Sequence, residues 1–203
     1  VTLGNATSGT FNTKDVGTTK AVTTAMTISG ASAGYYTLTQ PALTGAVTAK
    51  ALTVTGTTVA TKPYDDSTAA ALTGGVLSGV VGGDEVTLNA SGTFNTKDVG
   101  TGKVVTSTST LAGAQKANYT LTQPTGLTGT ITALVVTLSG SRTYDGTTNV
   151  AAASLAIGNK VGGEDLSLSG SASLAGKDVG SQALVSGTPI MRVTRCRCTS
   201  AKH

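Results

Sequence analysis

Apolar residues along this chain alternate with small polar ones over short stretches. The alternation has a period of two at residues 52–55, 86–88, 119–122 and 130–132. A period of two places the apolar side chains on one face of a β-strand, and no stretch of comparable length carries a helical spacing. Thr and Val, which are β-branched, are abundant throughout. The pattern therefore predicts an all-β protein.

Turn-forming residues divide the middle of the chain into about seven predicted strands. Seven short strands favour a small immunoglobulin-like β-sandwich, with a compact β-grasp unit as an alternative. A β-solenoid is a further alternative, although its expected sub-repeats of about twenty residues are not found. The predicted strands lie near residues 51–59, 68–73, 76–80, 86–94, 103–111, 118–123 and 128–132.

Several blocks of sequence recur in the same order. The stretch GTFNTKDVGT at 9–18 returns unchanged at 92–101, and a related stretch, SLAGKDVGS, stands at 173–181. YTLTQP is found at 36–41 and again at 119–124, and VVGGDEVTL at 80–88 is answered by KVGGEDLSL at 160–168. Recurring blocks at one period define a folding unit, here of about 80 residues.

The repeat divides the chain into four predicted parts. Residues 1–49 are the C-terminal part of one repeat, residues 50–132 are a complete repeat, and residues 133–188 are the N-terminal part of a third. Residues 189–203 form a basic, non-repeat tail, which we interpret as a foreign or frame-shifted ending, with a genuine terminal segment as the alternative. We expect the chain to be a window from a longer, rod-like array, with a well-formed sheet core only in residues 51–132.

Charge and composition exclude several classes of function. The formal net charge of +4 comes from the tail, because Arg192, Arg195, Arg197 and Lys202 leave ten basic residues against ten acidic ones in the rest of the chain. A neutral body with 3% aromatic residues lacks the basic stripe and stacking platform of a nucleic-acid-binding protein. No apolar run is long enough for direct insertion into a membrane.

Five segments together resemble a known family. They are TAKALTVTG at 48–56, the Tyr-Asp-Asp turn at 64–66, VGGD at 81–84, KDVG at 97–100 and NYTL at 118–121. This succession resembles the YDG repeat of bacterial haemagglutinin-like and filamentous adhesin surface proteins. The namesake motif is intact at Tyr144-Asp145-Gly146, whereas Asp66 stands where glycine is expected.

The resemblance implies a stalk or adhesive shaft on an extracellular, outer-membrane-associated protein of a bacterial cell surface, with no enzymatic residue. Its expected partners are glycans or proteins on host or neighbouring cells, together with the neighbouring repeats of the same chain. The alternatives are a carbohydrate-binding module, which should carry clustered exposed aromatic rings, and an accessory region of an extracellular enzyme.

Each repeated motif is interpreted as structural. The Tyr-Asp-Gly element is predicted to be a turn rather than a ligand contact. The Lys-Asp-Val-Gly element, at Lys14, Lys97 and Lys177, is predicted to be a turn rather than the source of an internal isopeptide bond.

We predict no catalytic, cofactor-binding or metal-binding residue and no cofactor. The acidic pairs at 84–85 and 164–165 do not supply the converging oxygens that calcium requires. Cys196, Cys198 and His203 provide only three candidate zinc ligands and lack a second pair. Because the only histidine lies in the tail, the body has no Ser–His pair, and the chain is predicted not to be an enzyme.

Overall fold

The computed structural model describes residues 1–185 and 195–199, and for 195–199 it describes the backbone alone. The described residues form strands joined by turns and by three-residue 3-10 helices at Ala33–Tyr35 (η1), Lys116–Asn118 (η2) and Ala152–Ser154 (η3). The prediction of an all-β protein is confirmed. Within the part of the chain that the structure describes, no helix is long and apolar enough to span a membrane.

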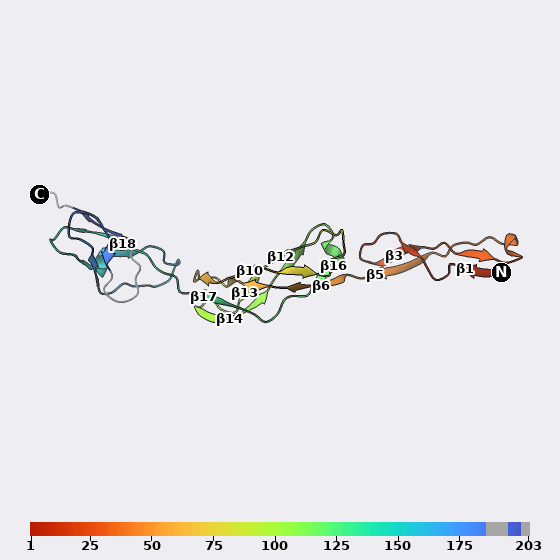
Figure 1. Cartoon of the computed structure of the whole chain (residues 1–203), viewed down its shortest axis with the longest axis horizontal. Coiled ribbons are helices and arrows are strands. Elements are labelled where there is room, and N and C mark those ends of the chain that lie inside the picture. Colours follow the sequence, from red (N-terminus) through yellow and green to blue (C-terminus); the bar gives the residue numbers. More distant parts are fainter. Residues whose placement is uncertain (186–194, 200–203) are drawn as a thin grey trace. The chain divides into compact units, whose positions relative to one another are not determined.

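The chain divides into two compact units. Figure 1 labels the main strands along the chain. Unit 1 comprises Val1–Ala60, Ala69–Asn95 and Gly102–Gly129. Unit 2 comprises Thr61–Thr68, Thr96–Thr101 and the chain from Thr130 onward.

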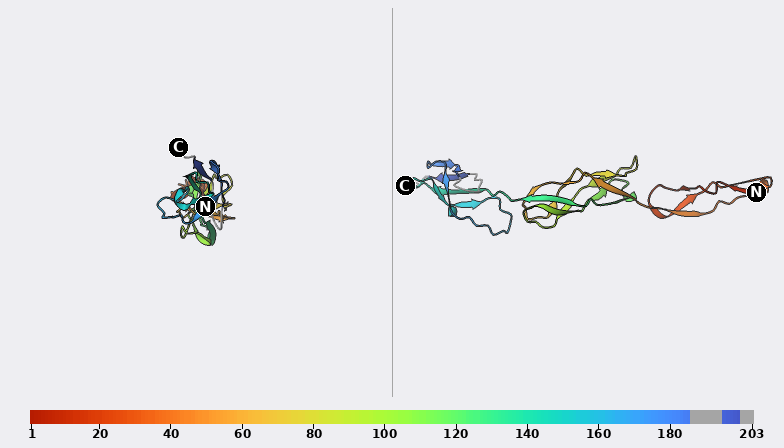
Figure 2. Two further views of the ribbon diagram at one scale, coloured as in Figure 1. Left: turned by 90° about the vertical axis from the view of Figure 1, so that its left-hand side faces the viewer. Right: turned by 60° about the horizontal axis from the view of Figure 1, so that its bottom comes forward.

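Residues 1–49 of unit 1 form an antiparallel ribbon (Figure 2). Its strands are β1 (Thr2–Gly4) paired with β4 (Thr27–Ser29), and β3 (Gly17–Thr23) paired on either side with β2 (Thr10–Phe11) and β5 (Leu43–Val47). No hydrophobic side chain in this range is buried. Hydrogen bonds of the backbone, rather than a core, therefore hold this ribbon together.

The remainder of unit 1 contains several short ladders. In the first, β6 (Lys50–Thr55) lies between β11 (Val76–Ser78), which is antiparallel to it, and β16 (Tyr119–Leu121), which is parallel. Two two-stranded ladders pair β7 (Thr58–Val59) with β10 (Leu72–Thr73) and β12 (Thr87–Asn89) with β15 (Thr110–Ala112). A further sheet runs β17 (Leu127–Thr132), β14 (Gly100–Ser107), β13 (Gly92–Phe94), β9 (Ala69–Ala70).

The predicted strands occur, but four of them are interrupted. Residues 51–59, 68–73, 86–94 and 103–111, each predicted as one strand, are each divided between two strands. At one break Gly56 and Gly74 oppose each other, both with φ of +73°. A Cβ on Gly74 would stand 2.7 Å from the carbonyl oxygen of Gly56. The left-handed backbone and this close approach explain why the ladder stops there.

The core of unit 1 centres on a phenylalanine that packs against a glycine. Phe94 is 1% exposed, and a Cβ on Gly129 would lie 2.9 Å from its ring and 2.5 Å from the side chain of Val59. A larger residue than glycine on β17 would therefore displace the ring. The other buried apolar side chains of this unit are Leu52, Ala70, Leu72, Val105 and Tyr119.

Unit 2 has its own small core, so the prediction that a sheet core forms only in residues 51–132 is wrong. Val150, Leu174 and Leu184 are buried together, with Leu155 and Ala172 packed against them. Its sheets run β20 (Leu155–Ile157), β18 (Leu138–Thr143), β24 (Arg195–Thr199), β22 (Gly180–Gln182), and β19 (Asn149–Ala151), β21 (Ser171–Leu174), β23 (Leu184–Val185). The two-residue strand β8 (Lys62–Pro63) pairs in parallel with Ile131 and Thr132.

Candidate functional site

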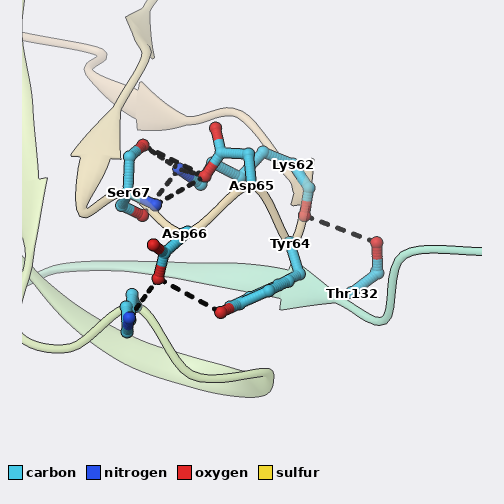
Figure 3. Close-up of polar contacts among 7 residues, drawn as sticks. Lys62, Tyr64, Asp65, Asp66, Ser67 and Thr132 are labelled. Atoms are coloured by element: carbon cyan, nitrogen blue, oxygen red, sulfur yellow. Dashed lines mark hydrogen bonds and ion pairs between the residues drawn. The ribbon is translucent and has the colours of Figure 1, made fainter. Parts of the chain in front are cut away.

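The Tyr-Asp-Asp turn is stabilised by one carboxylate oxygen (Figure 3). Asp65 Oδ1 accepts hydrogen bonds from both the amide and the hydroxyl of Ser67, each at 3.0 Å, and from Lys62 Nζ at 2.6 Å. The amide of Tyr64 donates to the carbonyl of Thr132 at 2.8 Å. The hydrogen bond from Lys62, followed by that from the Ser67 amide, lowers the pKa of Asp65. Asp65 therefore closes its own turn.

The second aspartate of this turn takes the place of the expected glycine. Asp66 has a φ of +62°, the same left-handed conformation as Gly146 at +77°. The substitution thus leaves the turn type unchanged, because aspartate is one of the few residues that enter this region. Asp66 also gains two partners, Lys97 Nζ and the hydroxyl of Tyr64 at 3.2 Å. The Lys97 hydrogen bond lowers the pKa of Asp66, and Asp66 raises the pKa of Lys97.

The Tyr-Asp-Gly turn is built in the same way. Asp145 Oδ1 accepts from the amide of Thr147 at 2.9 Å and from its hydroxyl at 2.8 Å, and it pairs with Arg142 three residues earlier. The hydrogen bond from Arg142 is the main cause of a pKa of about 2 for Asp145. Arg142 thus stands where Lys62 stands in the other copy. The aspartates of both turns are consequently held by a cation and by their own backbone.

The acidic turn of unit 1 forms a second polar cluster. Asp84 is nearly buried and accepts from Lys14 Nζ at 2.6 Å and from the hydroxyl of Tyr119 at 2.7 Å. The amide of Val81 donates to the same hydroxyl at 3.1 Å. The bonds from Lys14 and then Tyr119 lower the pKa of Asp84, whereas Asp84 raises the pKa of both partners.

Lys14 and Asp84 are close enough to be considered for an isopeptide bond, but their charge states do not favour one. Forming an amide requires a neutral amine and the loss of water from a carboxylic acid. Here the pKa of Lys14 is raised and that of Asp84 is lowered, so both groups are held in their charged forms. The geometry supports an ion pair.

The loop after Lys14 makes two further contacts with Asn118. The amide of Val16 donates to Asn118 Oδ1 at 2.9 Å, and Asn118 Nδ2 donates to Asp15 Oδ1 at 3.0 Å. A cavity of about 230 Å³ lies beside these residues and is also lined by Val47, Thr48 and Lys50. It falls short of the roughly 300 Å³ at which small-molecule pockets begin.

The acidic turn of unit 2 contacts the tyrosine of the Tyr-Asp-Asp turn. The hydroxyl of Tyr64 donates to Glu164 Oε1, and this bond is the main reason why the pKa of Tyr64 is raised. Of the four acids at 84–85 and 164–165 that were considered for calcium, Glu164 and Asp84 thus each accept a hydrogen bond from a hydroxyl group. Among the described residues, no three His, Cys, Asp or Glu side chains converge on a point that could hold a metal ion.

The repeated blocks match a family model described as the YDG domain. The matches cover residues 1–44, 48–126 and 128–193, and so most of the chain. The chain belongs to the YDG domain family. No curated protein and no solved structure matches it. The Tyr-Asp turns lie in the second and third YDG matches, and the acidic turns lie in the same two.

A repeated glutamine is a structural residue of these YDG segments that the sequence did not single out. Gln123 accepts from the hydroxyl of Ser107 at 2.6 Å and donates to the carbonyl of Ser109 at 2.7 Å, where the ribbon of β14 and β15 breaks. Gln40 bonds both the amide and the carbonyl of Met26 at the matching break. The only sequence signal was the repetition of YTLTQP, which does not specify a partner for the amide.

The remaining candidates of the YDG chain are not drawn into either cluster. Among the described residues, the side chains of Lys177 and Tyr144 make no hydrogen bond. The side chains of Cys196 and Cys198 and the whole of His203 lie outside the described residues.

Proposed function

We propose that this chain supplies structural and adhesive stalk repeats of a secreted bacterial surface protein, without enzymatic activity. The observation that carries the proposal is the tandem succession of three YDG matches. In this proposal the middle match, residues 48–126, is a small immunoglobulin-like β-sandwich module of about 80 residues, and the other two matches are parts of such modules. Two features support a spacer role. The body of the chain is neutral, and the aspartates of its Tyr-Asp turns are used to hold those turns rather than to present reactive groups to a cleft.

Adhesion is tested with beads coated with the full chain. We expect such beads to be retained on fixed host cells or on neighbouring bacterial cells more strongly than beads coated with an unrelated all-β protein of neutral charge. Pretreating the cells with glycosidases or with proteases separates glycan from protein partners. Retention equal to that of the control protein on every surface would contradict the adhesive part of the proposal.

Modularity is tested by pulling single full-length chains from their two ends. The repeats around Phe94 and around Val150 should unfold in separate events, because each of them has its own buried core. Cooperative loss of all structure in one event would reject the modular part and leave the bead assay unaffected.

A carbohydrate-binding module is a second candidate, favoured by one specific observation. Tyr35 and Tyr36 are adjacent and are 88% and 63% exposed, which is how aromatic rings are presented to the faces of sugars. A glycan array probed with the full chain and with Tyr35→Ala tests this candidate. A glycan signal lost with Tyr35→Ala would favour it, whereas an array without any signal would reject it.

A further inference from the structure

Two polar clusters, one in each unit, are related by the repeat. Lys14 and Lys97 occupy the same position of the KDVG motif in successive copies, and Asp84 and Glu164 occupy the same position of the acidic turn. Lys14, from the first YDG match, binds Asp84 of the second. In the other cluster Tyr64, from the second match, binds Glu164 of the third. The same end of one segment therefore meets the same turn of the next segment twice.

The two acidic turns have the same shape. The amide of Asp84 donates to the carbonyl of Val81 at 3.1 Å, and the amide of Glu164 donates to that of Val161 at 3.4 Å. The glycine before each acid has a positive φ, +88° at Gly83 and +82° at Gly163. Each turn consequently presents its carboxylate on a preformed backbone.

The groups that receive this turn are donors of complementary chemistry. In unit 1 the donor is an ammonium group, supplemented by the contacts of Val16 and Asp15 with Asn118. In unit 2 the donor is the hydroxyl of Tyr64, and Lys97 lies near enough that Glu164, after Asp66, raises its pKa. In each cluster the carboxylate of the later repeat accepts a hydrogen bond from a group of the earlier repeat, Lys14 Nζ in unit 1 and the Tyr64 hydroxyl in unit 2. The contact therefore has a defined direction along the chain.

We infer that the Tyr-Asp turn and the KDVG loop at one end of a YDG repeat form a docking surface for the acidic Gly-Gly turn of the repeat that follows. The partner of this surface is a second YDG repeat, recognised through its single carboxylate. The inference rests on the modular part of the proposed function and not on adhesion. The third YDG segment carries the same groups, Tyr144 and Lys177, without a side-chain hydrogen bond among the described residues. It therefore offers a matched control within the chain.

The test removes one tyrosine hydroxyl from the proposed contact and one from the control segment. Tyr64→Phe and Tyr144→Phe are the same chemical change and both keep the ring. Amide hydrogen exchange of residues 161–166, measured by NMR in the full chain, should accelerate about two- to fivefold in Tyr64→Phe, since the bond lost is partly exposed. Tyr144→Phe should leave these rates unchanged. Equal rates in the two variants would overturn the inference.

A second background shows whether the carboxylate is the recognised group. In Glu164→Gln, the further change Tyr64→Phe should accelerate exchange by less than it does in the parent chain, because the two residues share one contact. The same acceleration in both backgrounds would also overturn the inference. Either result leaves the bead retention assay unaffected, so failure of docking and failure of adhesion can be told apart.

Discussion

At the Tyr-Asp turns, a single aspartate determines the backbone conformation that follows it. Asp65 and Asp145 each accept the amide and the hydroxyl of the residue two positions later. The residue that follows the aspartate, Asp66 in one turn and Gly146 in the other, has a left-handed backbone conformation in both copies. The sequence predicted a turn at these positions because aspartate and glycine are turn formers. It did not predict that Asp66 would hold Lys97, because the two are far apart along the chain.

The need for glycine at position 146 can be tested by adding a methyl group, which has enough space there but disfavours the left-handed backbone of this residue. No atom lies within 4 Å of a Cβ at this position, so Gly146→Ala should be destabilised by backbone strain alone, at roughly 1 kcal/mol. Gly162→Ala is the matched control, because that glycine also has open space but no positive φ. Urea denaturation followed by circular dichroism checks both. Equal destabilisation would show that the turn tolerates alanine.

Asp145 should make the free energy of unfolding depend on pH in the acidic range. Its pKa is about 2 in the folded chain against an ordinary 3.8, so the folded state favours the charged form. The resulting stabilisation is fully present above about pH 4 and is lost as the pH falls towards 2. Asp145→Asn should be less stable than the parent chain at neutral pH and equal to it near pH 2. A stability difference between the two chains that is the same at both pH values would contradict this prediction.

At the scale of elements, some breaks in the ladders occur at glycines with a left-handed backbone, and others where a side chain replaces the backbone hydrogen bonds. Gly56 and Gly74 stop one ladder through their backbone conformation, and Gln123 occupies the break in another. The period of two predicted where strands lie. It could not predict the breaks, because small residues such as Ser107 and Ser109 fit equally well in a strand and beside a glutamine.

Two phenylalanines at the same repeat position allow the contribution of core burial to stability to be measured. Phe94 is 1% exposed and Phe11 is 39% exposed, although each stands in GTFNTKDVGT. Phe94→Ala should cost about 3 to 5 kcal/mol of unfolding free energy, and Phe11→Ala about 1 kcal/mol or less. Chemical denaturation of both variants checks the difference. Similar costs would show that residues 1–49 have a core comparable with that around Phe94.

At the scale of the whole molecule, stability should follow the distribution of buried apolar side chains. Residues 1–49 contain no buried hydrophobic residue, whereas Phe94 and Val105 lie in the core of unit 1 and Val150 and Leu174 in that of unit 2. Amide hydrogen exchange of the full chain should therefore be fastest in residues 1–49 and slowest in β13, β14 and β21. Protection of residues 1–49 equal to that of β14 would contradict this expectation.

Sequence by itself determined the all-β class, the YDG family and the positions of the turns, because each of these depends on residues close together along the chain. The tertiary structure decided which copy of a repeated residue is buried. Tyr36 and Tyr119 occupy the same motif, yet Tyr36 is 63% exposed and Tyr119 is 7% exposed, with its hydroxyl bonded to Asp84. The same residues follow both tyrosines and give similar local preferences, but burial depends on partners that are distant in sequence.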